Sequence, residues 1–375
     1  MASLYLHIPF CVKKCHYCSF DSCAEGGAIF AQYVAALKKE LFELAHKRNE
    51  RPLKSLFIGG GTPSVLPSFM LVELLDHCRE LFPPAQQAEI SIEANPGTVD
   101  ESSLSALMGA GVNRLSLGVQ SFNDQELQVL GRIHNGLVAC DAVSVAKRTG
   151  FTNINIDLMY GLPGQTVASW HSSLEQAITL YPQHLSLYQL TVEEGTPFQQ
   201  AVAGGGLILP EEEEVLQMDY VSASQCGAAG FQQYEISNFA IPGYECLHNI
   251  NYWQNGEYLA CGASAVSCVA GVRKKRIPDP WEYIRRMNTG LSLYIESECL
   301  STEASFRESV IMGLRMTKGV SLEQLNARYQ IDLVAYYGSI LEKLIDLKLI
   351  ELTTTSLSLT AKGRPFANWI MAELV

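Results

Sequence analysis

Three cysteines near the start of the chain have the residue type and spacing to hold a reactive metal centre. Cys11, Cys15 and Cys18 follow the pattern Cys-x3-Cys-x2-Cys. Iron–sulfur clusters are held by cysteine thiolates, normally four of them. Three thiolates would leave one iron of a [4Fe–4S] cluster with an open position, and an open position separates reactive metal sites from structural ones. The triplet therefore predicts a cluster that can take a further ligand.

The spacing alone leaves two other interpretations open. The three cysteines could be reduced core residues, or they could be three ligands of a zinc site with His16 as the fourth. Cys23 lies close in sequence, but we expect it to be no ligand of the cluster.

The elements that would position this centre alternate between strand and helix. Runs of β-branched and aromatic residues predict strands near 3–8, 55–58, 89–93, 114–119, 153–159 and 185–190. Helical patterns lie between them, near 30–48, 67–82, 100–109, 124–130 and 137–149. Six such βα units predict an α/β fold, an incomplete (β/α)6 barrel.

Glycines and polar residues follow successive predicted strands at their carboxyl ends. In order they are the run Gly59-Gly60-Gly61-Thr62-Pro63, Glu93 with Asn95-Pro96, Gln120, Asp157 and Thr191. In β/α barrels this rim carries the functional residues. We expect the glycine run to bring backbone N–H donors close to a ligand. A buried acid needs a cationic or hydrogen-bonding partner, which could be a ligand or a structural salt bridge.

Composition restricts the class of partner. The net charge of -12 and the pI near 5.2 argue against nucleic acid. The basic run at 273–276 is expected to be a solvated loop. With no secretory signal and no long apolar run, the eleven cysteines are expected to be ligands or core residues in a cytoplasmic protein. Membrane association is not indicated.

The chain divides into three predicted regions. Residues 1–195 form the barrel, residues 196–300 extend it, and residues 301–375 form a small winged-helix-like α+β domain. The last prediction comes from helical patterns near 305–316, 321–329 and 333–347, followed by an alternating stretch at 350–360 and a final helix near 364–374. We expect this region to have a structural or docking role and not to bind DNA strongly.

Several motifs together resemble the oxygen-independent coproporphyrinogen III oxidase family of radical S-adenosylmethionine (SAM) proteins. They include Tyr5-Leu-His-Ile-Pro-Phe-Cys, Glu93-Ala-Asn-Pro, Leu130-Gly-Arg-Ile-His and Asp157-Leu-Met-Tyr-Gly-Leu-Pro-Gly-Gln. The resemblance implies a [4Fe–4S] cluster and bound SAM. It also implies a set of SAM contacts: Tyr5, Gly60, Gly61, Thr62, Glu93, Gln120, Arg132 and Asp157, with Thr191 a weaker match.

Two departures resemble one branch of that family, the haem chaperones known as HemW. Phe20 stands where the oxidising branch has a fourth cysteine, and the cluster motif comes very early. The run His248-Asn-Ile-Asn-Tyr-Trp253 matches a motif of the chaperone branch. This implies His248 as a haem ligand, with Cys246 as a competing thiolate and a structural histidine as the alternative.

The expected function is therefore a haem chaperone that passes haem to an unknown haem-accepting protein. The alternative is an enzyme that oxidatively decarboxylates coproporphyrinogen III through SAM radical chemistry. A nucleic-acid-modifying radical SAM enzyme is a third hypothesis, which the acidic composition opposes. Whether the chain is an enzyme, and which electron donor serves it, stay open.

Overall fold

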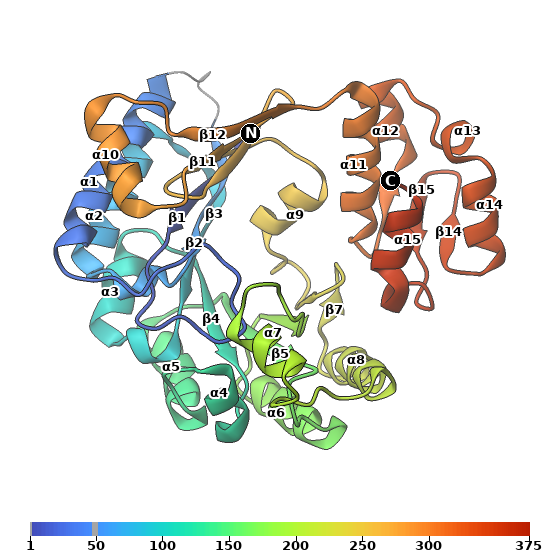
Figure 1. Cartoon of the computed structure of the whole chain (residues 1–375), viewed down its shortest axis with the longest axis horizontal. Helices are drawn as coiled ribbons and strands as arrows, with labels where there is room; N and C mark the ends of the chain where they lie inside the picture. Colours follow the sequence, from blue (N-terminus) through green and yellow to red (C-terminus); the bar gives the residue numbers. More distant parts are fainter. Residues whose placement is uncertain (1, 47–51) are drawn as a thin grey trace.

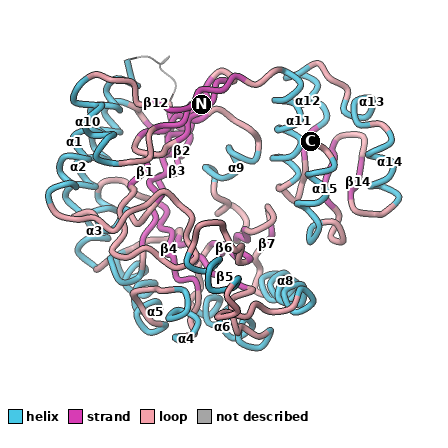
Figure 2. Tube along the Cα trace, viewed as in Figure 1, coloured by secondary structure: helices cyan, strands magenta, loops and turns pink. Residues whose placement is uncertain are grey.

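One mixed sheet forms the larger part of the molecule. The computed structural model describes residues 2–46 and 52–375. The sheet has twelve strands in the order β12-β11-β10-β9-β1-β2-β3-β4-β5-β6-β8-β7 (Figures 1 and 2). The strands are β1 (Ala2–Ile8), β2 (Leu53–Gly60), β3 (Pro84–Ala94), β4 (Arg114–Gln120), β5 (Ile154–Tyr160), β6 (His184–Gln189), β7 (Gln232–Gln233), β8 (Asn238–Ala240), β9 (Tyr258–Cys261), β10 (Val266–Val269), β11 (Val272–Arg276) and β12 (Tyr294–Cys299).

The six predicted strands are the parallel centre of this sheet. Strands β1 to β6 pair in sequence order, each parallel to the next. The sheet stays open: β9 adds in parallel beside β1, antiparallel strands continue outward from it, and β8 pairs antiparallel with β6. The segment 196–300 thus supplies strands to both edges of the sheet. The predicted α/β order is confirmed.

Helices connect the parallel strands and cover the sheet (Figure 1). The predicted end of the first helix at residue 48 lies outside the described residues. The helices of this part are α1 (Ala28–His46), α2 (Ser68–Leu81), α3 (Glu101–Gly109), α4 (Asp124–Leu130), α5 (Gly136–Thr149), α6 (Val167–Thr179), α7 (Pro197–Ala203), α8 (Glu212–Ala228), α9 (Leu247–Trp253) and α10 (Pro280–Thr289).

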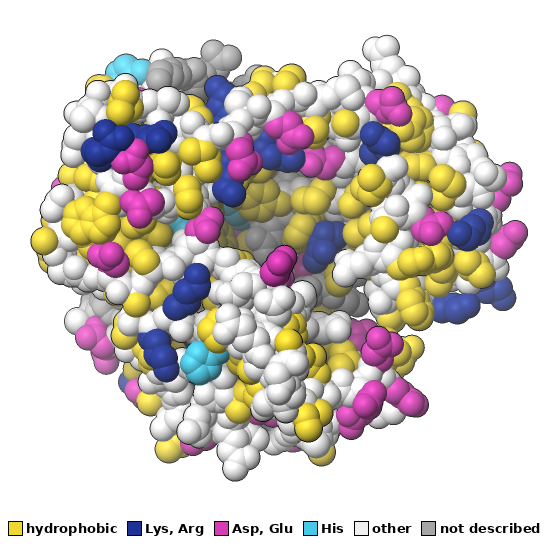
Figure 3. All heavy atoms as spheres, in the orientation of Figure 1, with side chains coloured by type: hydrophobic (Ala, Val, Ile, Leu, Met, Phe, Trp, Pro, Cys, Tyr) yellow, Lys and Arg dark blue, Asp and Glu magenta, His cyan; other side chains and the backbone are white. Residues whose placement is uncertain are grey.

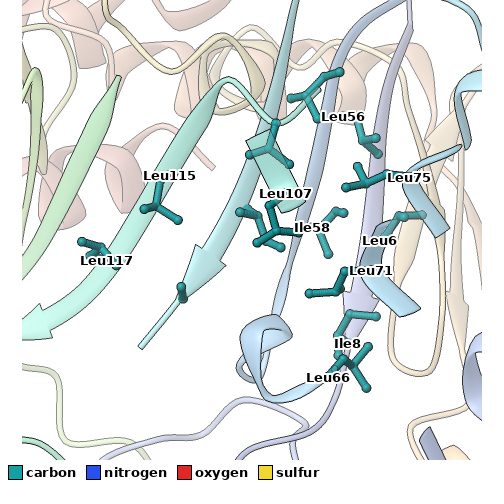
Figure 4. Close-up of a cluster of buried hydrophobic side chains, with 14 of the residues drawn as sticks. Leu6, Ile8, Leu56, Ile58, Leu66, Leu71, Leu75, Leu107, Leu115 and Leu117 are labelled. Atoms are coloured by element: carbon teal, nitrogen blue, oxygen red, sulfur yellow. The ribbon is translucent and has the colours of Figure 1, made fainter. Parts of the chain in front are cut away.

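The sheet and its helices bury an aliphatic core. Leu6 of β1, Ile58 of β2 and Leu115 of β4 lie on one side of the sheet with Leu71 of α2 and Leu107 of α3 (Figure 4). Each of these side chains is almost fully buried. Burial of a leucine or isoleucine side chain contributes about 1.5–3 kcal/mol, so this layer fixes the strand ends in place.

The basic run at 273–276 is not a solvated loop, as its charge had suggested. It lies in β11, where Arg273 pairs with Glu308 at 2.5 Å. Arg276 is fully buried and forms an ion pair with Glu40. These carboxylate partners come from two helices in distant parts of the chain, so the sequence around the run could not reveal them.

The C-terminal residues have a hydrophobic core of their own, built around Phe306, Leu344 and Leu357. The predicted helix at 333–347 is two helices, because Gly338 breaks it with a φ of +46°. The elements are α11 (Thr302–Leu314), β13 (Val320–Ser321), α12 (Leu322–Tyr329), α13 (Leu333–Tyr337), α14 (Ser339–Asp346), β14 (Ile350–Leu352), β15 (Ser356–Leu359) and α15 (Ala367–Glu373).

This arrangement of helices with a three-stranded sheet, in the order β13-β15-β14, agrees with the winged-helix-like prediction. The space-filling view is hollowed between the sheet-bearing part and the C-terminal helices, near α9 (Figures 1 and 3).

Candidate functional site

A cavity of about 500 Å³ opens at the carboxyl ends of the parallel strands. Every site residue predicted from the sequence contributes to its wall. These residues are Tyr5, Cys11, Cys15, Cys18, Gly60, Gly61, Thr62, Glu93, Gln120, Arg132, Asp157, Thr191 and His248. Residues up to 243 positions apart in sequence therefore meet in one place, as expected for functional residues on one rim of a parallel sheet.

The cysteine loop after β1 presents its thiols to this cavity. Cys11 Sγ accepts a hydrogen bond from Thr62 Oγ1 at 3.6 Å. Cys15 Sγ accepts one from Arg132 Nη1 at 3.4 Å. Metal is bound by the thiolate form of cysteine, and sulfur in that form accepts such hydrogen bonds.

Cys23 faces the other way. Its backbone pairs with Phe10 in a short parallel bridge, in which Cys23 N donates to Pro9 O and Cys11 N donates to Cys23 O. Paired residues of parallel strands project to the same side, and their neighbours to the opposite side. Phe10 is fully buried and Cys23 packs against the same core. Cys23 therefore projects away from the side taken by Cys11.

His16 packs against the C-terminal end of α4. One ring nitrogen, Nδ1, lies 3.1 Å from the carbonyl oxygen of Val129, and the ring packs close to Gly131. Among residues 2–46 and 52–375, no three His, Cys, Asp or Glu side chains converge tightly enough to hold a single metal ion. A four-iron cluster spreads its cysteines over different irons and does not need that convergence.

The glycine run works differently from the sequence expectation. The N–H groups of Gly61 and Thr62 do not face a ligand, because they donate to the carbonyl oxygens of Ile8 and Phe10 at 2.8 and 2.7 Å. A Cβ at Gly61 would lie 2.6 Å from the Phe10 carbonyl oxygen. A side chain at Gly61 would prevent this close approach, which joins the cysteine loop to the end of β2.

Glu93 and Asp157 form an acidic pair on the cavity wall. Glu93 Oε2 accepts from the N–H of Gly60 at 3.1 Å, and a Cβ at Gly59 would clash with it. Burial, with the nearby Asp157 charge, raises the pKa of Glu93 to about 7. Burial also raises the pKa of Asp157. Positive charge nearby stabilises both carboxylates, as Arg114 on the same cavity wall does in part, so the pair suits a cationic ligand.

Gln120 and Arg132 lie at the end of β4 and in the connection from β4 to β5. Gln120 ends β4 in the left-handed region, with a φ of +69°, which is uncommon for a residue with a side chain. Arg132 Nη2 donates to Gly118 O and to Asn95 Oδ1. Its Nε is buried without a hydrogen-bond partner among the described residues. Desolvation opposes the charge of Arg132, but Tyr17 and Cys15 raise its pKa.

His248 lies deep in the same cavity, beside Tyr5. The ring stacks on Phe57 at 5.1 Å and is only 1% exposed. Its Nδ1 lies 2.9 Å from Ser55 Oγ, and its Nε2 lies 3.3 Å from Tyr252 OH. Burial lowers the pKa of His248 to about 3. The imidazole is therefore neutral, and both of its nitrogens are paired.

Cys246 is more enclosed still. The residue is fully buried, and its Sγ lies 3.4 Å from Glu89 Oε1. Burial raises the pKa of the Cys246 thiol to about 12. Glu89 also accepts the backbone N–H of Leu247 at 2.7 Å, so it holds the start of α9 against β3.

Two cavity residues were given no role in the sequence analysis. Arg114 is 2% exposed and lines the cavity, and its Nε is buried without a hydrogen-bond partner among the described residues. Asn95 bonds both Thr62 and Arg132. The signal for Arg114 was a cation at the start of an otherwise apolar strand. The signal for Asn95 was its position two residues after Glu93, just beyond the third predicted strand.

Comparison with known proteins decides the family. Residues 5–177 match the radical SAM superfamily, and residues 300–366 match the HemN C-terminal domain. The haem chaperone HemW of Bacillus subtilis is 37% identical over 376 residues, which cover 100% of this chain and 99% of that protein. The chain belongs to the HemW family. The haem chaperone HemW of Escherichia coli is 44% identical over 264 residues, covering 70% of this chain and 69% of that protein.

The solved structure of the E. coli coproporphyrinogen III oxidase HemN, described as a radical SAM enzyme, has the same fold. Its TM-score is 0.86 at 26% identity, with coverage of 100% of this chain and 89% of that one. The HemW-family chain therefore has the architecture of HemN, including the C-terminal domain.

Membership of the radical SAM superfamily implies a [4Fe–4S] cluster and SAM, and the cavity fits both. Donors from Thr62 and Arg132 already lie on two of the three thiols. SAM carries a sulfonium and an amino group, and Glu93 and Asp157 are carboxylates on the wall of the same cavity. No helix in the described part of the chain is both long and apolar enough to cross a bilayer.

Proposed function

We propose that this chain is a haem chaperone that holds a [4Fe–4S] cluster on Cys11, Cys15 and Cys18 and binds SAM in the same cavity. The observation that carries the proposal is whole-length similarity to proteins named haem chaperone HemW, at 37% identity to the B. subtilis protein and 36% to that of Lactococcus lactis. The cavity supports it by bringing the cluster cysteines, the acidic pair and His248 together.

The residues of the cavity wall divide the work of holding the cofactors. The three cysteines take the cluster, whose chemistry when loaded is electron transfer to SAM. Glu93 and Asp157 offer carboxylates to the cationic and hydroxyl groups of SAM. Tyr5, Gln120 and the glycine run shape the pocket around it. Arg132 neutralises charge beside Cys15.

Haem would be ligated by Nε2 of His248. Ser55 Oγ donates its proton to Ser3 Oγ at 2.8 Å, so its lone pair accepts the hydrogen of His248 Nδ1. This leaves the lone pair on Nε2, where Tyr252 OH now donates at 3.3 Å. A neutral histidine whose other nitrogen donates to a fixed acceptor is the usual arrangement for a metal ligand. Nε2 would then hold haem in place of its present contact with the Tyr252 hydroxyl.

Cys246 is the weaker candidate. Ligation by thiolate needs a deprotonated sulfur, and the pKa of about 12 keeps Cys246 protonated at neutral pH. Its thiol already contacts the Glu89 carboxylate.

Oxidation of coproporphyrinogen III is the second candidate function, because the HemN fold and the cavity are both retained. Phe20 argues against it. Its side chain lines the cavity and is 66% exposed, at the place where the oxidising branch has a fourth cysteine.

A haem titration of the anaerobic, cluster-loaded protein tests the proposal. Wild type should give a saturable, shifted Soret band, and His248→Ala should weaken or alter it, whereas Cys246→Ala should not. Absence of saturable haem binding by wild type would remove the chaperone proposal.

The partners and the site of action extend the same proposal. Haem, a haem-accepting protein and an electron donor are the expected partners. All eleven cysteines are free thiols, which suits a reducing compartment such as the cytoplasm. We also retain the division at 1–195, 196–300 and 301–375 as proposed domain boundaries.

A further inference from the structure

A continuous chain of hydrogen bonds joins two of the three cluster cysteines, and Asn95 is its centre. On one side, Asn95 Nδ2 donates to Thr62 Oγ1 at 3.0 Å, and Thr62 Oγ1 donates to Cys11 Sγ at 3.6 Å. On the other side, Asn95 Oδ1 accepts from Arg132 Nη2, and Arg132 Nη1 donates to Cys15 Sγ at 3.4 Å. The side chain of Asn95 itself touches neither sulfur in this chain of bonds.

The amide of Asn95 sets the direction of every bond in this chain. A hydroxyl has one proton to give. Because Thr62 Oγ1 accepts from the Asn95 amide, its own proton is left for Cys11. The amide oxygen on the opposite end can only accept, so it holds the Arg132 guanidinium in the position from which it reaches Cys15. Thr62 is 4% exposed, so solvent offers its hydroxyl little competition.

We propose that Asn95 is a positioning residue that sets the reduction potential of the cluster by aiming donors at two cysteine sulfurs. The inference rests on the proposed cluster at Cys11, Cys15 and Cys18. Reduction adds negative charge to the cluster, and hydrogen bonds to the sulfurs are among the terms that set its potential. Donors on Cys11 and Cys15 stabilise the reduced state and raise the potential.

The substitution Asn95→Asp separates this role from packing. Aspartate has the same shape and still accepts from Arg132, but it cannot donate to Thr62. The Thr62 hydroxyl then turns its proton toward the carboxylate and away from Cys11. The potential of the cluster, measured by anaerobic redox titration with electron paramagnetic resonance, should become more negative. Asn135→Asp is the matched control, because Asn135 is an exposed helix cap where aspartate serves equally well, and it should leave the potential unchanged.

A double-mutant cycle with Thr62→Val shows whether Asn95 acts through the hydroxyl. Thr62→Val alone should lower the potential, and Asn95→Asp should then cause a smaller further shift than it causes in wild type. Equal shifts in both backgrounds, or no shift for Asn95→Asp beyond that of Asn135→Asp, would overturn the inference. If Asn95→Asp does not take up iron, the uncharged Asn95→Leu replaces it, with a negative shift expected and an unchanged potential again contradicting the inference.

Failure of the proposed function gives a different result. A wild-type protein that takes up no four-iron cluster on anaerobic reconstitution would overturn both proposals. A wild-type protein with a normal cluster signal and an unresponsive Asn95→Asp variant would overturn only the role of Asn95.

Discussion

Replacement of Glu93 by glutamine should stabilise the cofactor-free protein at alkaline pH and weaken its affinity for SAM. The folded protein raises the pKa of Glu93 from 4.5 to about 7, mainly by burial. Between these two values the folded state binds more protons than the unfolded state, so the contribution of Glu93 to stability falls as the pH rises from about 4.5 through 7. Glu93→Gln removes this pH-dependent loss.

The magnitude follows from the size of the change in pKa. At 1.36 kcal/mol per pKa unit, the upper limit is about 3 kcal/mol. The carboxylate borders the cavity and keeps some hydration, so we expect a gain of about 1–2 kcal/mol at pH 8 and almost none at pH 4. Urea unfolding of the cluster-free protein at both pH values measures the difference.

A control carboxylate with a lowered pKa should show the opposite dependence on pH. The helix cap Asp100, whose pKa is lowered by hydrogen bonds from Ser103 and Ser102, is the control. Asp100→Ala should lose stability at neutral pH and progressively less as the pH falls through the lowered pKa. Equal effects of Glu93→Gln at pH 4 and pH 8 would refute the account of Glu93. Unchanged SAM binding would show that the Glu93 carboxylate is not a SAM contact.

Other outcomes follow from the same cavity. Cys15→Ala should abolish the cluster signal on reconstitution. Cys23→Ala should keep about four irons per chain, because Cys23 faces the core. Equal loss of iron in both variants would contradict this. Tyr252→Phe should strengthen haem binding by about fivefold, since it removes a hydrogen bond to His248 Nε2 worth about 1 kcal/mol. Weaker binding in a Soret titration would show that the Tyr252 hydroxyl does not compete with haem for Nε2.

The sequence predicted the elements that carry the site because its strands alternate regularly with helices. Each of the six strands begins and ends within a few residues of its prediction, apart from the longer β3. Polar residues after successive strands had to share a rim, since all six strands are parallel. This is why the cysteines, Glu93, Gln120 and Asp157 could be placed together in advance.

Features that depend on packing between distant segments were not predictable in the same way. The partners of the Gly61 and Thr62 N–H groups are carbonyl oxygens of the cysteine loop, about fifty residues earlier. The positions that pair with Arg273 lie in β12 and α11. A local pattern shows that such groups are polar or charged, but it does not show which distant partner they meet.

Asn95 shows the limit most clearly. Its place at the end of a strand was visible in the sequence, but its role depends on two hydrogen bonds to separate connections. Likewise, the motif around His248 was visible, but the burial of the ring between Phe57, Ser55 and Tyr252 required the folded chain.

The central claim is that this chain carries haem and does not oxidise a porphyrinogen. Its most direct test follows haem and coproporphyrinogen III in parallel, with the cluster-loaded protein, SAM and a reductant under anaerobic conditions. The account predicts that haem-loaded protein transfers haem to an apo-haemoprotein, seen as growth of the acceptor's Soret band, while coproporphyrinogen III stays unchanged. Rapid conversion of coproporphyrinogen III to protoporphyrinogen IX, without haem transfer, would contradict it.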